Sequence, residues 1–398
     1  MKRRTFVVGA GALMGAGMLA SNMKREPEKN IVRNLDPVAD AAAIAAVEQS
    51  GVIDVHRHIV PPAMRDLLAR RNTRSLAGLE LPDWSPESFI ASLQADGVQT
   101  AITSAVLPGI QVGEAELTAF SHSSNEFSRE LAERHKGRMG FFAHLPLPYT
   151  ERACAEAIHA LDTLQADGVV LMASNDGKFL GDPLFTELMH ELNERSAIVF
   201  VHPNVPATDP LGLSTPLSVV EYPCDITRAG LNLILSGTME RFHKIRWILA
   251  HAGGFLPYVA WRVSLANTMI EYGDTATQGV LTYLRRFYLD TATSLSRPSM
   301  ATLRELVEPD RLLFGTDAPF ASGQHAQQQI KELVASDFWS AGEAARVERG
   351  NALSLFPGYK QPDEAVAALP SFEQESLLNG TKRQVLSPLR SLAQKLRE

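Results

Sequence analysis

The sequence predicts an α/β fold, a (β/α)8 TIM barrel built from eight parallel strands that alternate with helices. Eight short apolar runs lie between residues 51 and 317, and longer amphipathic segments separate them. The runs are rich in Val, Ile, Leu and Phe rather than alternating, as expected for parallel strands that are buried on both faces. A doubly wound open sheet is the alternative. No Gly-x-Gly-x-x-Gly follows any run, so a dinucleotide site has no support.

The eight runs are expected to form the strands in chain order. Each is short enough for a strand and ends near polar or turn-forming residues. They are GVIDVH (51–56), VQTAITSAV (98–106), RMGFFAHLPL (138–147), GVVLMAS (168–174), AIVFVHP (197–203), IRWILAH (245–251), FYLDTA (287–292) and RLLFGTD (311–317).

Two of the intervening segments carry clear helix signals. Residues 114–135 place apolar side chains at helical spacing. Residues 182–196 begin with Asp182 as an N-cap and Pro183 at the first helical position. Both segments follow predicted strands, as a barrel of strand–helix units requires.

The N-terminus has the layout of an export signal. Lys2, Arg3 and Arg4 precede an uncharged, Gly- and Ala-rich run from Phe6 to Ala20. This pattern resembles a twin-arginine signal over residues 1–22 and predicts export to the periplasm. An uncleaved signal that anchors the chain to the membrane, and a cytoplasmic location, are the alternatives.

The rest of the chain divides into three parts. Residues 23–50 are expected to form a linker and a short helix, and residues 51–356 the barrel. Residues 357–398 form a C-terminal tail that ends in a short basic amphipathic helix. We expect this tail to make a surface or oligomer contact.

Composition excludes several classes of function. The formal net charge of −7 leaves no basic excess to neutralise phosphates, so no nucleic-acid partner is expected. Cys154 and Cys224 are the only cysteines. They lack the Cys-x-x-Cys spacing of zinc or redox sites, and two thiols cannot build a disulfide framework.

Ionisable residues gather at the predicted strand ends. The first strand is expected to end with His56, Arg57 and His58, while His202 lies at the end of the fifth run, His251 of the sixth and Asp317 of the eighth. Alternation places His56, His58 and also Asp54 on one side of the first strand. In a parallel barrel the carboxyl ends of the strands form the active face. We therefore expect these side chains to meet there.

Imidazole and carboxylate are the ligands that Zn(II), Mn(II) and Fe(II) accept. We expect His56, His58, His202 and Asp317 to bind one divalent metal, with Zn(II) preferred and Mn(II) as the second candidate. His251 would then stand beside the metal as a catalytic residue that transfers protons or stabilises an oxyanion.

These motifs resemble the amidohydrolase superfamily. The matching text includes DVHRHIVPP, the stretch that ends in AIVFVHP, KIRWILAHAGGFLPY and LLFGTDAPF, and the likeness spans roughly residues 51–356. It is greatest for the aminocarboxymuconate-semialdehyde decarboxylase-like, amidohydrolase-related branch. Within that branch the stretches look most like 6-methylsalicylate decarboxylase and its relatives. The resemblance implies a barrel of the metal-dependent hydrolase type that assembles as a homodimer or homotetramer.

Two departures from the superfamily pattern affect the site. Many members carry a bridging lysine at the end of strand four, whereas the fourth run here reads GVVLMASNDGK, with Lys178 in the loop beyond it. One metal is therefore expected rather than two. Arg57, between the two histidines, should point away from the metal and pair with an acidic residue behind the barrel.

The resemblance implies nonoxidative decarboxylation of a small hydroxybenzoate-like or vinylogous carboxylic acid. Asp317, or a water held by His251, would deliver the proton. A metal-dependent hydrolase acting on a lactone, amide or ester with the same ligands is the alternative, and a non-catalytic binding barrel is a third.

Arg228 is a candidate partner for the substrate carboxylate, with a salt bridge on its helix as the equal alternative. Asn175 is a candidate pocket residue, with a plain turn as the alternative.

Overall fold

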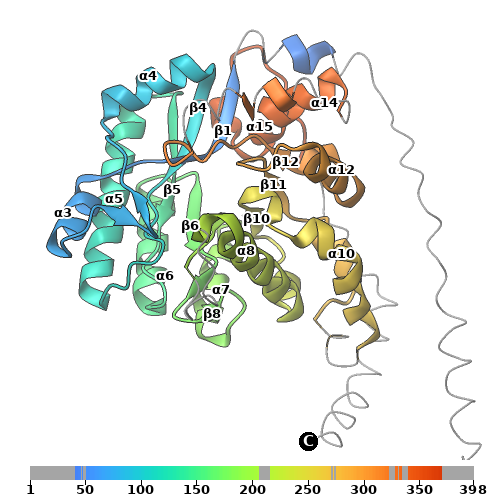
Figure 1. Ribbon diagram of the computed structural model, residues 1–398, viewed down its shortest axis with the longest axis horizontal. Helices are drawn as coiled ribbons and strands as arrows, with labels where there is room; N and C mark the ends of the chain where they lie inside the picture. The colour runs from blue at the N-terminus through green and yellow to red at the C-terminus, as the bar shows by residue number, and fades with distance from the viewer. Residues whose placement is uncertain are drawn as a thin grey trace, which may run out of the picture. The chain divides into compact units, whose positions relative to one another are not determined.

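The computed structural model describes most of the predicted barrel (Figure 1). The expected signal at 1–22, nearly all of the expected linker at 23–50 and the expected C-terminal helix lie outside the described residues. The described residues are 41–45, 47, 51–205, 216–269, 272, 275–321, 328–329, 331–333 and 339–369.

Eight parallel strands form one sheet in the order expected from the sequence, so the barrel prediction is confirmed. Each of the eight apolar runs overlaps one strand. Seven strands are shorter than their runs, whereas β1 extends two residues beyond the first run, to His58. The strands are β1 (Val52–His58), β4 (Val98–Ser104), β5 (Met139–His144), β6 (Gly168–Met172), β9 (Ile198–His202), β10 (Arg246–Leu249), β11 (Tyr288–Asp290) and β12 (Leu312–Leu313).

The segment after β12 returns to β1 and brings the two ends of the sheet together. The Val55 amide donates to the Phe314 carbonyl at 2.9 Å, and the Asp317 amide donates to the His56 carbonyl at 2.8 Å. The His58 amide donates to the Ala318 carbonyl at 2.7 Å. These bonds fix the backbone of Asp317 directly beside the two histidines of β1.

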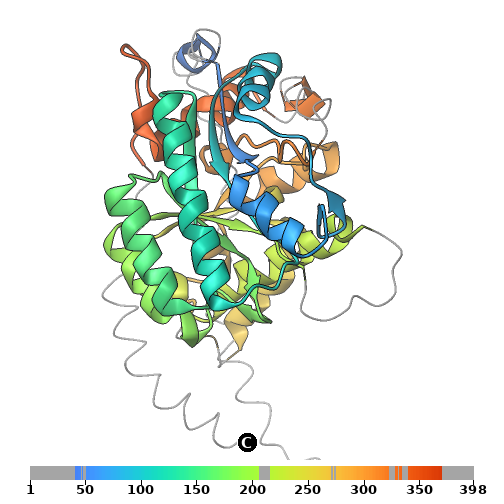
Figure 2. The same cartoon turned by 90° about the vertical axis from the view of Figure 1, so that its left-hand side faces the viewer.

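Every strand of the barrel sheet is followed by at least one helix before the next barrel strand or the end of the described barrel. Figure 2 shows the long helix α5 running beside α3 and α6 on the outside of the barrel. The helices are α3 (Pro62–Arg70), α4 (Pro86–Asp96), α5 (Glu114–Arg134), α6 (Thr150–Ile158), α7 (Thr186–Glu194), α8 (Leu217–Leu235), α9 (Thr238–Arg241), α10 (Leu256–Ser264), α11 (Val280–Leu284), α12 (Arg297–Leu306), α14 (Ala341–Ala345) and α15 (Asn351–Leu355).

Shorter elements connect these parts. Two small hairpins, β2–β3 (Ser75–Leu76 and Leu79–Glu80) and β7–β8 (Ser174–Asn175 and Lys178–Phe179), stand outside the barrel sheet. The 3₁₀ and π turns are η1 (His159–Thr163), η2 (Pro183–Phe185), η3 (His251–Gly253), η4 (Leu265–Thr268), η6 (Pro309–Arg311), η7 (Arg346–Gly350) and η8 (Pro357–Tyr359).

The two helix predictions hold with one refinement. The segment 114–135 forms α5. Asp182 accepts a hydrogen bond from the Leu184 amide at 2.9 Å, as an N-cap should. The first turn that it caps is the 3₁₀ turn η2, and the α-helix α7 begins only after it.

The pairing register of β1 with β4 shifts between Asp54 and Arg57. Simple alternation along β1 therefore does not predict the direction of every side chain in the strand. Arg57 pairs with Asp96 at the end of α4, as expected for a side chain directed away from the metal site. Asp54, however, does not join His56 and His58. Its carboxylate accepts from the Thr316 hydroxyl at 2.6 Å and the Thr316 amide at 3.2 Å. Asp54 therefore supports the segment after β12 instead of the site.

The start of the C-terminal region is attached to the barrel. Arg349 is fully buried and binds both carboxylate oxygens of Glu364, at 2.6 and 2.7 Å. Arg349 also donates to the Gly51 carbonyl at 3.1 Å, just before β1. Residues 357–369 therefore pack on the barrel, and the tail predicted to start at 357 continues outside the described residues.

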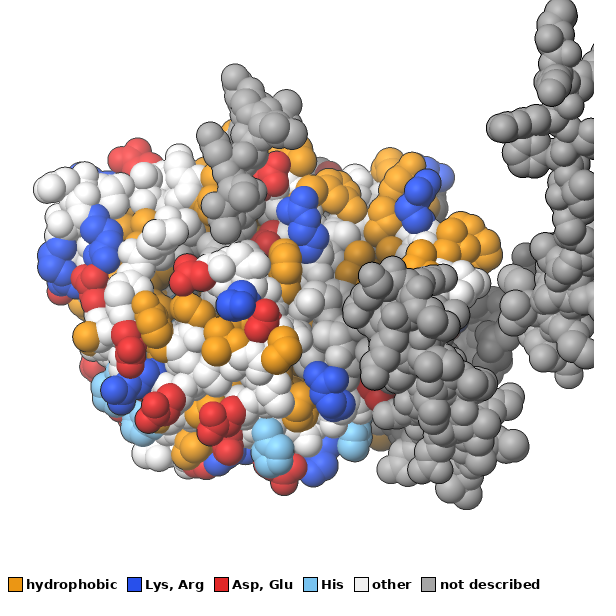
Figure 3. Space-filling view, turned by 90° about the horizontal axis from the view of Figure 1, so that it is seen from below, with side chains coloured by type: hydrophobic (Ala, Val, Ile, Leu, Met, Phe, Trp, Pro, Cys, Tyr) orange, Lys and Arg blue, Asp and Glu red, His pale blue; other side chains and the backbone are white. Residues whose placement is uncertain are grey.

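The described surface carries charges of both signs. On the face shown in Figure 3, acidic and basic side chains are interspersed without a large patch of one sign. Among the described helices, none has both the length and the apolar composition needed to cross a bilayer.

Candidate metal centre and active site

Four of the predicted site residues meet at the carboxyl end of the barrel. His56 and His58 come from β1, His202 is the last residue of β9, and Asp317 follows β12. Each offers one ligand atom, and the four atoms lie within 4.8 Å of one another. The three histidines are almost completely buried, and Asp317 is partly buried.

The two histidines of β1 approach each other closely through the same ring atom. The Nε2 atoms of His56 and His58 are 3.2 Å apart, and the rings meet edge to face with centroids 5.0 Å apart. Their spacing of two residues puts both side chains on the inner face of the strand. The His202 ring lies 5.0 Å from the His58 ring and 5.5 Å from the His56 ring.

The other ring nitrogen of each histidine has a hydrogen-bond partner. His56 Nδ1 lies 2.8 Å from Asp290 Oδ2, and His202 Nδ1 lies 2.9 Å from the Pro203 carbonyl oxygen. Ser104 Oγ lies 3.0 Å from His58 Nδ1. An ionised carboxylate and a carbonyl can only accept, so His56 and His202 carry their proton on Nδ1 when neutral. Their Nε2 lone pairs are then free to bind a metal.

This arrangement fits a divalent cation. Asp317 Oδ1 lies 3.1 Å from His58 Nε2 and 3.5 Å from His56 Nε2. Ligands about 2.0–2.1 Å from a tetrahedral metal are themselves separated by about 3.3 Å. Lone pairs and a carboxylate at these distances repel one another unless a metal ion or a proton lies between them. The acceptors on Nδ1 act as the outer partners that orient metal-binding imidazoles.

For most of these groups the electrostatic surroundings favour the protonation state that binds a metal, which is neutral imidazole for histidine and ionised carboxylate for aspartate. Burial lowers the pKa of His58, and burial together with the neighbouring His58 and His56 holds the pKa of His202 well below its ordinary value. Burial opposes ionisation of Asp317, but the His58 hydrogen bond and the nearby histidines outweigh it, so its pKa is lowered. His56 differs: burial lowers its pKa, yet the Asp290 carboxylate outweighs this effect and the pKa is raised. A bound metal must therefore compete with a proton at His56.

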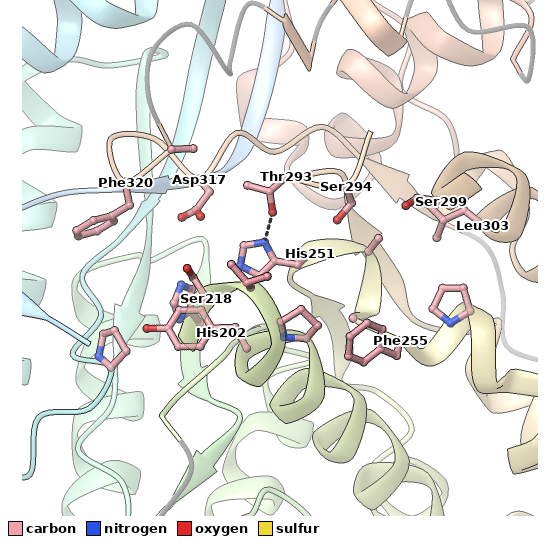
Figure 4. A pocket seen from close by; sticks show the side chains of 18 of the residues that line it. His202, Ser218, His251, Phe255, Thr293, Ser294, Ser299, Leu303, Asp317 and Phe320 are labelled. Atoms are coloured by element: carbon pink, nitrogen blue, oxygen red, sulfur yellow. Dashed lines mark hydrogen bonds between the residues drawn. The ribbon is translucent and has the colours of Figure 1, made fainter. Parts of the chain in front are cut away.

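His251 stands next to this group without belonging to it. Its ring centroid is 5.0 Å from that of His56, and its Nδ1 lies 3.2 Å from the Ala292 carbonyl oxygen and 3.1 Å from Thr293 Oγ1. Figure 4 shows the Thr293 contact, with His251 and Asp317 exposed to the same cavity. Burial lowers the pKa of His251, which favours a neutral ring.

Two site residues adopt a backbone conformation that is uncommon outside glycine. His251 has φ 54° and Asp317 has φ 63°. Such left-handed residues cost about 1–3 kcal/mol each and persist where the surroundings hold them. Here the His251 amide donates to Asp290 Oδ1 at 2.9 Å, and the Asp317 amide donates to the His56 carbonyl.

Asp290 is the important site residue that the sequence reasoning missed. It is the last residue of β11 and is completely buried. One oxygen binds His56 Nδ1, and the other accepts from the amides of His251 and Ala292, at 2.9 and 3.0 Å. It thus orients two of the predicted site histidines. The seventh run, FYLDTA, contains it at a strand end, so the rule that selected Asp317 would also have found it.

Two predicted substrate-binding residues are not brought to the site. Arg228 lies on α8 with an exposed side chain, whereas this helix contributes Ser218, Val219, Tyr222 and Pro223 to the cavity wall. Asn175 is buried in β7 and donates from Nδ2 to the Met172 carbonyl at 3.0 Å. Neither side chain lines the cavity. For Asn175, the local turn that was the alternative describes the structure better.

We call the four candidate ligands, His56, His58, His202 and Asp317, the metal-ligand group. This group opens into a cavity of about 980 Å³. His202, His251 and Asp317 line one part of it. A barrel with a His-x-His pair on its first strand, further histidines after later strands and an aspartate after the last is the arrangement that the sequence motifs predicted.

Comparison with known proteins identifies the family. A family model described as Amidohydrolase matches residues 53–358, so the chain belongs to the amidohydrolase family. Decarboxylase macB of Penicillium terrestre is 33% identical over 330 residues, which span 78% of this chain and 96% of the fungal protein. The 6-methylsalicylic acid decarboxylase of Penicillium expansum is 32% identical over 315 residues, spanning 77% of this chain and 97% of that protein. The resemblance inferred from the sequence is confirmed.

A solved structure shows the same fold with a metal. It is a dihydroxybenzoic acid decarboxylase from Polaromonas sp. with bound manganese and the inhibitor 2-nitroresorcinol. It aligns with a TM-score of 0.62 at 20% identity, covering 78% of this chain and 98% of that one. At this identity the likeness concerns the fold.

We predict that Asp290→Asn weakens metal binding about 10- to 100-fold, because the neutral amide no longer favours the Nδ1 proton of His56. Titration against a chromophoric chelator measures the dissociation constant. Asp310→Asn, which alters an exposed carboxylate before β12, is the matched control. Metal binding by Asp290→Asn as tight as that of the unmodified chain would show that Asp290 does not position the site.

Proposed function

We propose that this protein is a metal-dependent decarboxylase of a small hydroxybenzoate-like acid. The observation that carries the proposal is the convergence of three imidazoles and the Asp317 carboxylate at a cavity that also exposes His251. The fungal relatives named as decarboxylases, which match most of the chain, support the same reaction.

We propose that His56, His58, His202 and Asp317 hold one divalent metal. Three imidazoles and one carboxylate suit Zn(II), and the manganese bound by the Polaromonas structure makes Mn(II) the second candidate. A single metal is consistent with β6, which contains no lysine, while Lys178 lies beyond it and pairs with Asp182. Such a metal supplies a Lewis acid and template for the substrate carboxylate and an adjacent oxygen.

The chain's own residues then have to deliver one proton to the substrate. Decarboxylation places a proton on the ring carbon that bears the carboxylate. The bond between the two carbons breaks, its electron pair returns to the ring, and carbon dioxide leaves. The Ala292 carbonyl keeps a proton on His251 Nδ1, which leaves Nε2 able to hold a water. In this proposal the proton reaches the ring carbon from that water, or from Asp317, which lines the same cavity and would first take up the proton that it delivers.

Hydrolysis was the alternative that the sequence left open, because it needs the same ligands. The curated relatives do not favour it, since the two fungal proteins that match 77–78% of this chain are named decarboxylases.

We further propose that the chain is exported by a twin-arginine signal and assembles as a homodimer or homotetramer. Lys2, Arg3 and Arg4 with the uncharged run that follows support export, and the family resemblance supports assembly. Fractionation of cells producing the full chain, and light scattering of the purified protein, test the two proposals. A cytoplasmic location would contradict the export proposal, and a monomeric protein would contradict the assembly proposal.

The proposed reaction predicts carbon dioxide release from 6-methylsalicylate or a related hydroxybenzoate by the metal-loaded protein. Chelation should abolish it, and added metal should restore it. His202→Ala should lose activity together with the metal, while His190→Ala, which changes an exposed histidine on α7, should keep both.

The same preparations should release no protons from a panel of lactones in a pH-stat. Lactone opening without carbon dioxide release from any hydroxybenzoate would overturn the decarboxylase proposal in favour of the hydrolase.

A further inference from the structure

The cavity is much larger than the acid that the proposed reaction requires. Its volume of about 980 Å³ lies at the top of the range of roughly 300–1,000 Å³ that holds drug-sized ligands. A salicylate with one methyl group would fill only a small part of that space. The remaining volume must be occupied by water or by a larger part of the substrate.

The part of the cavity beside α12 lies away from the metal-ligand group. In Figure 4, Phe255, Ser299 and Leu303 lie on one side of His251, and Asp317 and Phe320 lie on the other. We call this part the α12 lobe. Its walls come from the start of α10 and from α12, and consist of Phe255, Pro257, Tyr258, Pro298, Ser299, Thr302 and Leu303.

Three serine and threonine hydroxyl groups near the α12 lobe have partners within the protein. Thr302 Oγ1 donates to the Pro298 carbonyl at 2.8 Å, and Ser294 Oγ donates to the Ala292 carbonyl at 3.0 Å. Ser299 Oγ lies 2.9 Å from Ser296 Oγ. With these hydroxyls engaged, the lobe presents mainly the carbon surface of prolines, phenylalanine and leucine, together with the largely exposed side chain of Tyr258.

Charged side chains are rare among the described residues of the cavity wall. Among the described residues that line it, Asp317 is the only acidic one, and none is lysine or arginine. A second carboxylate on the substrate would therefore enter without a cationic partner from these residues. Burying an unpaired charge is strongly unfavourable.

We propose that the natural substrate is a monocarboxylic hydroxybenzoate-type acid with an uncharged apolar substituent longer than methyl, which binds in the α12 lobe. This inference rests on the proposed decarboxylation and adds the class of substrate. The carboxylate end of the acid lies at the metal-ligand group, and the substituent packs against Phe255, Pro298 and Leu303.

A chain-length series tests the substrate class. 6-Methyl-, 6-pentyl- and 6-undecylsalicylate, and 6-pentylsalicylate with a terminal carboxylate, are compared by carbon dioxide release. Each methylene that enters the lobe should raise kcat/KM by up to about fourfold, so the pentyl acid should exceed the methyl acid by about tenfold to a hundredfold. The carboxylate-ended acid should lose this gain. Equal kcat/KM for the methyl and pentyl acids would overturn the inference.

Variants of the lobe test where the substituent binds. Thr302→Trp should lower the pentyl-to-methyl ratio of kcat/KM toward one by filling the lobe, and Ser299→Trp provides a second site for the same test. Both side chains are only partly buried, so neither change replaces a core residue. Glu305→Trp, on the exposed side of α12, is the matched control and should preserve the ratio. An unchanged ratio in both lobe variants would contradict the assignment.

Calorimetric binding of 3-methylphenol and 3-pentylphenol separates failure of the lobe from failure of the reaction. These phenols lack the carboxylate, so their binding does not depend on decarboxylation. Tighter binding of 3-pentylphenol that Thr302→Trp abolishes would support the lobe even if no acid were decarboxylated, and would place the error in the proposed reaction. Equal binding of both phenols, with 6-methylsalicylate decarboxylated, would leave the reaction standing and overturn the lobe.

Discussion

The close approach of the His56 and His58 Nε2 atoms, 3.2 Å apart in a buried site, is the constraint on which the structure around it depends. The Asp290 carboxylate at His56 Nδ1 and the Ser104 hydroxyl at His58 Nδ1 orient the two rings, and Asp317 adds a carboxylate at 3.1 Å from His58. A divalent cation between these groups would remove the repulsion between their lone pairs. Asp290 is central because it binds His56 through one oxygen and the His251 backbone through the other.

The barrel supplies the precision that this site needs. Asp317 is separated from β1 by most of the sequence, yet its amide binds the His56 carbonyl where the sheet closes. The left-handed backbone of Asp317 and of His251 is held by hydrogen bonds to other members of the site. The hydrogen bonds that close the sheet thus also position the residues of the site. For this reason the candidate ligands lie at or just beyond strand ends rather than on long loops.

Much of the fold and most of the metal-ligand group could be predicted from the sequence, because buried parallel strands leave continuous apolar runs and the active face follows their carboxyl ends. Asp290 was predictable by the same rule. Asp54 was misplaced because a register shift in β1 interrupts the alternation, and no local signal announces it. Arg228 could not be placed because the face that α8 turns to the cavity is set by packing against the barrel. The size and low charge of the cavity likewise depend on segments far apart in the chain.

Metal content of histidine variants tests the central claim most directly. We expect one equivalent of metal per chain in the unmodified protein and in His190→Ala. In both His56→Ala and His58→Ala we expect loss of that metal, with thermal unfolding confirming that the variants remain folded. Full metal occupancy in either β1 variant would contradict the assignment of these two histidines as ligands.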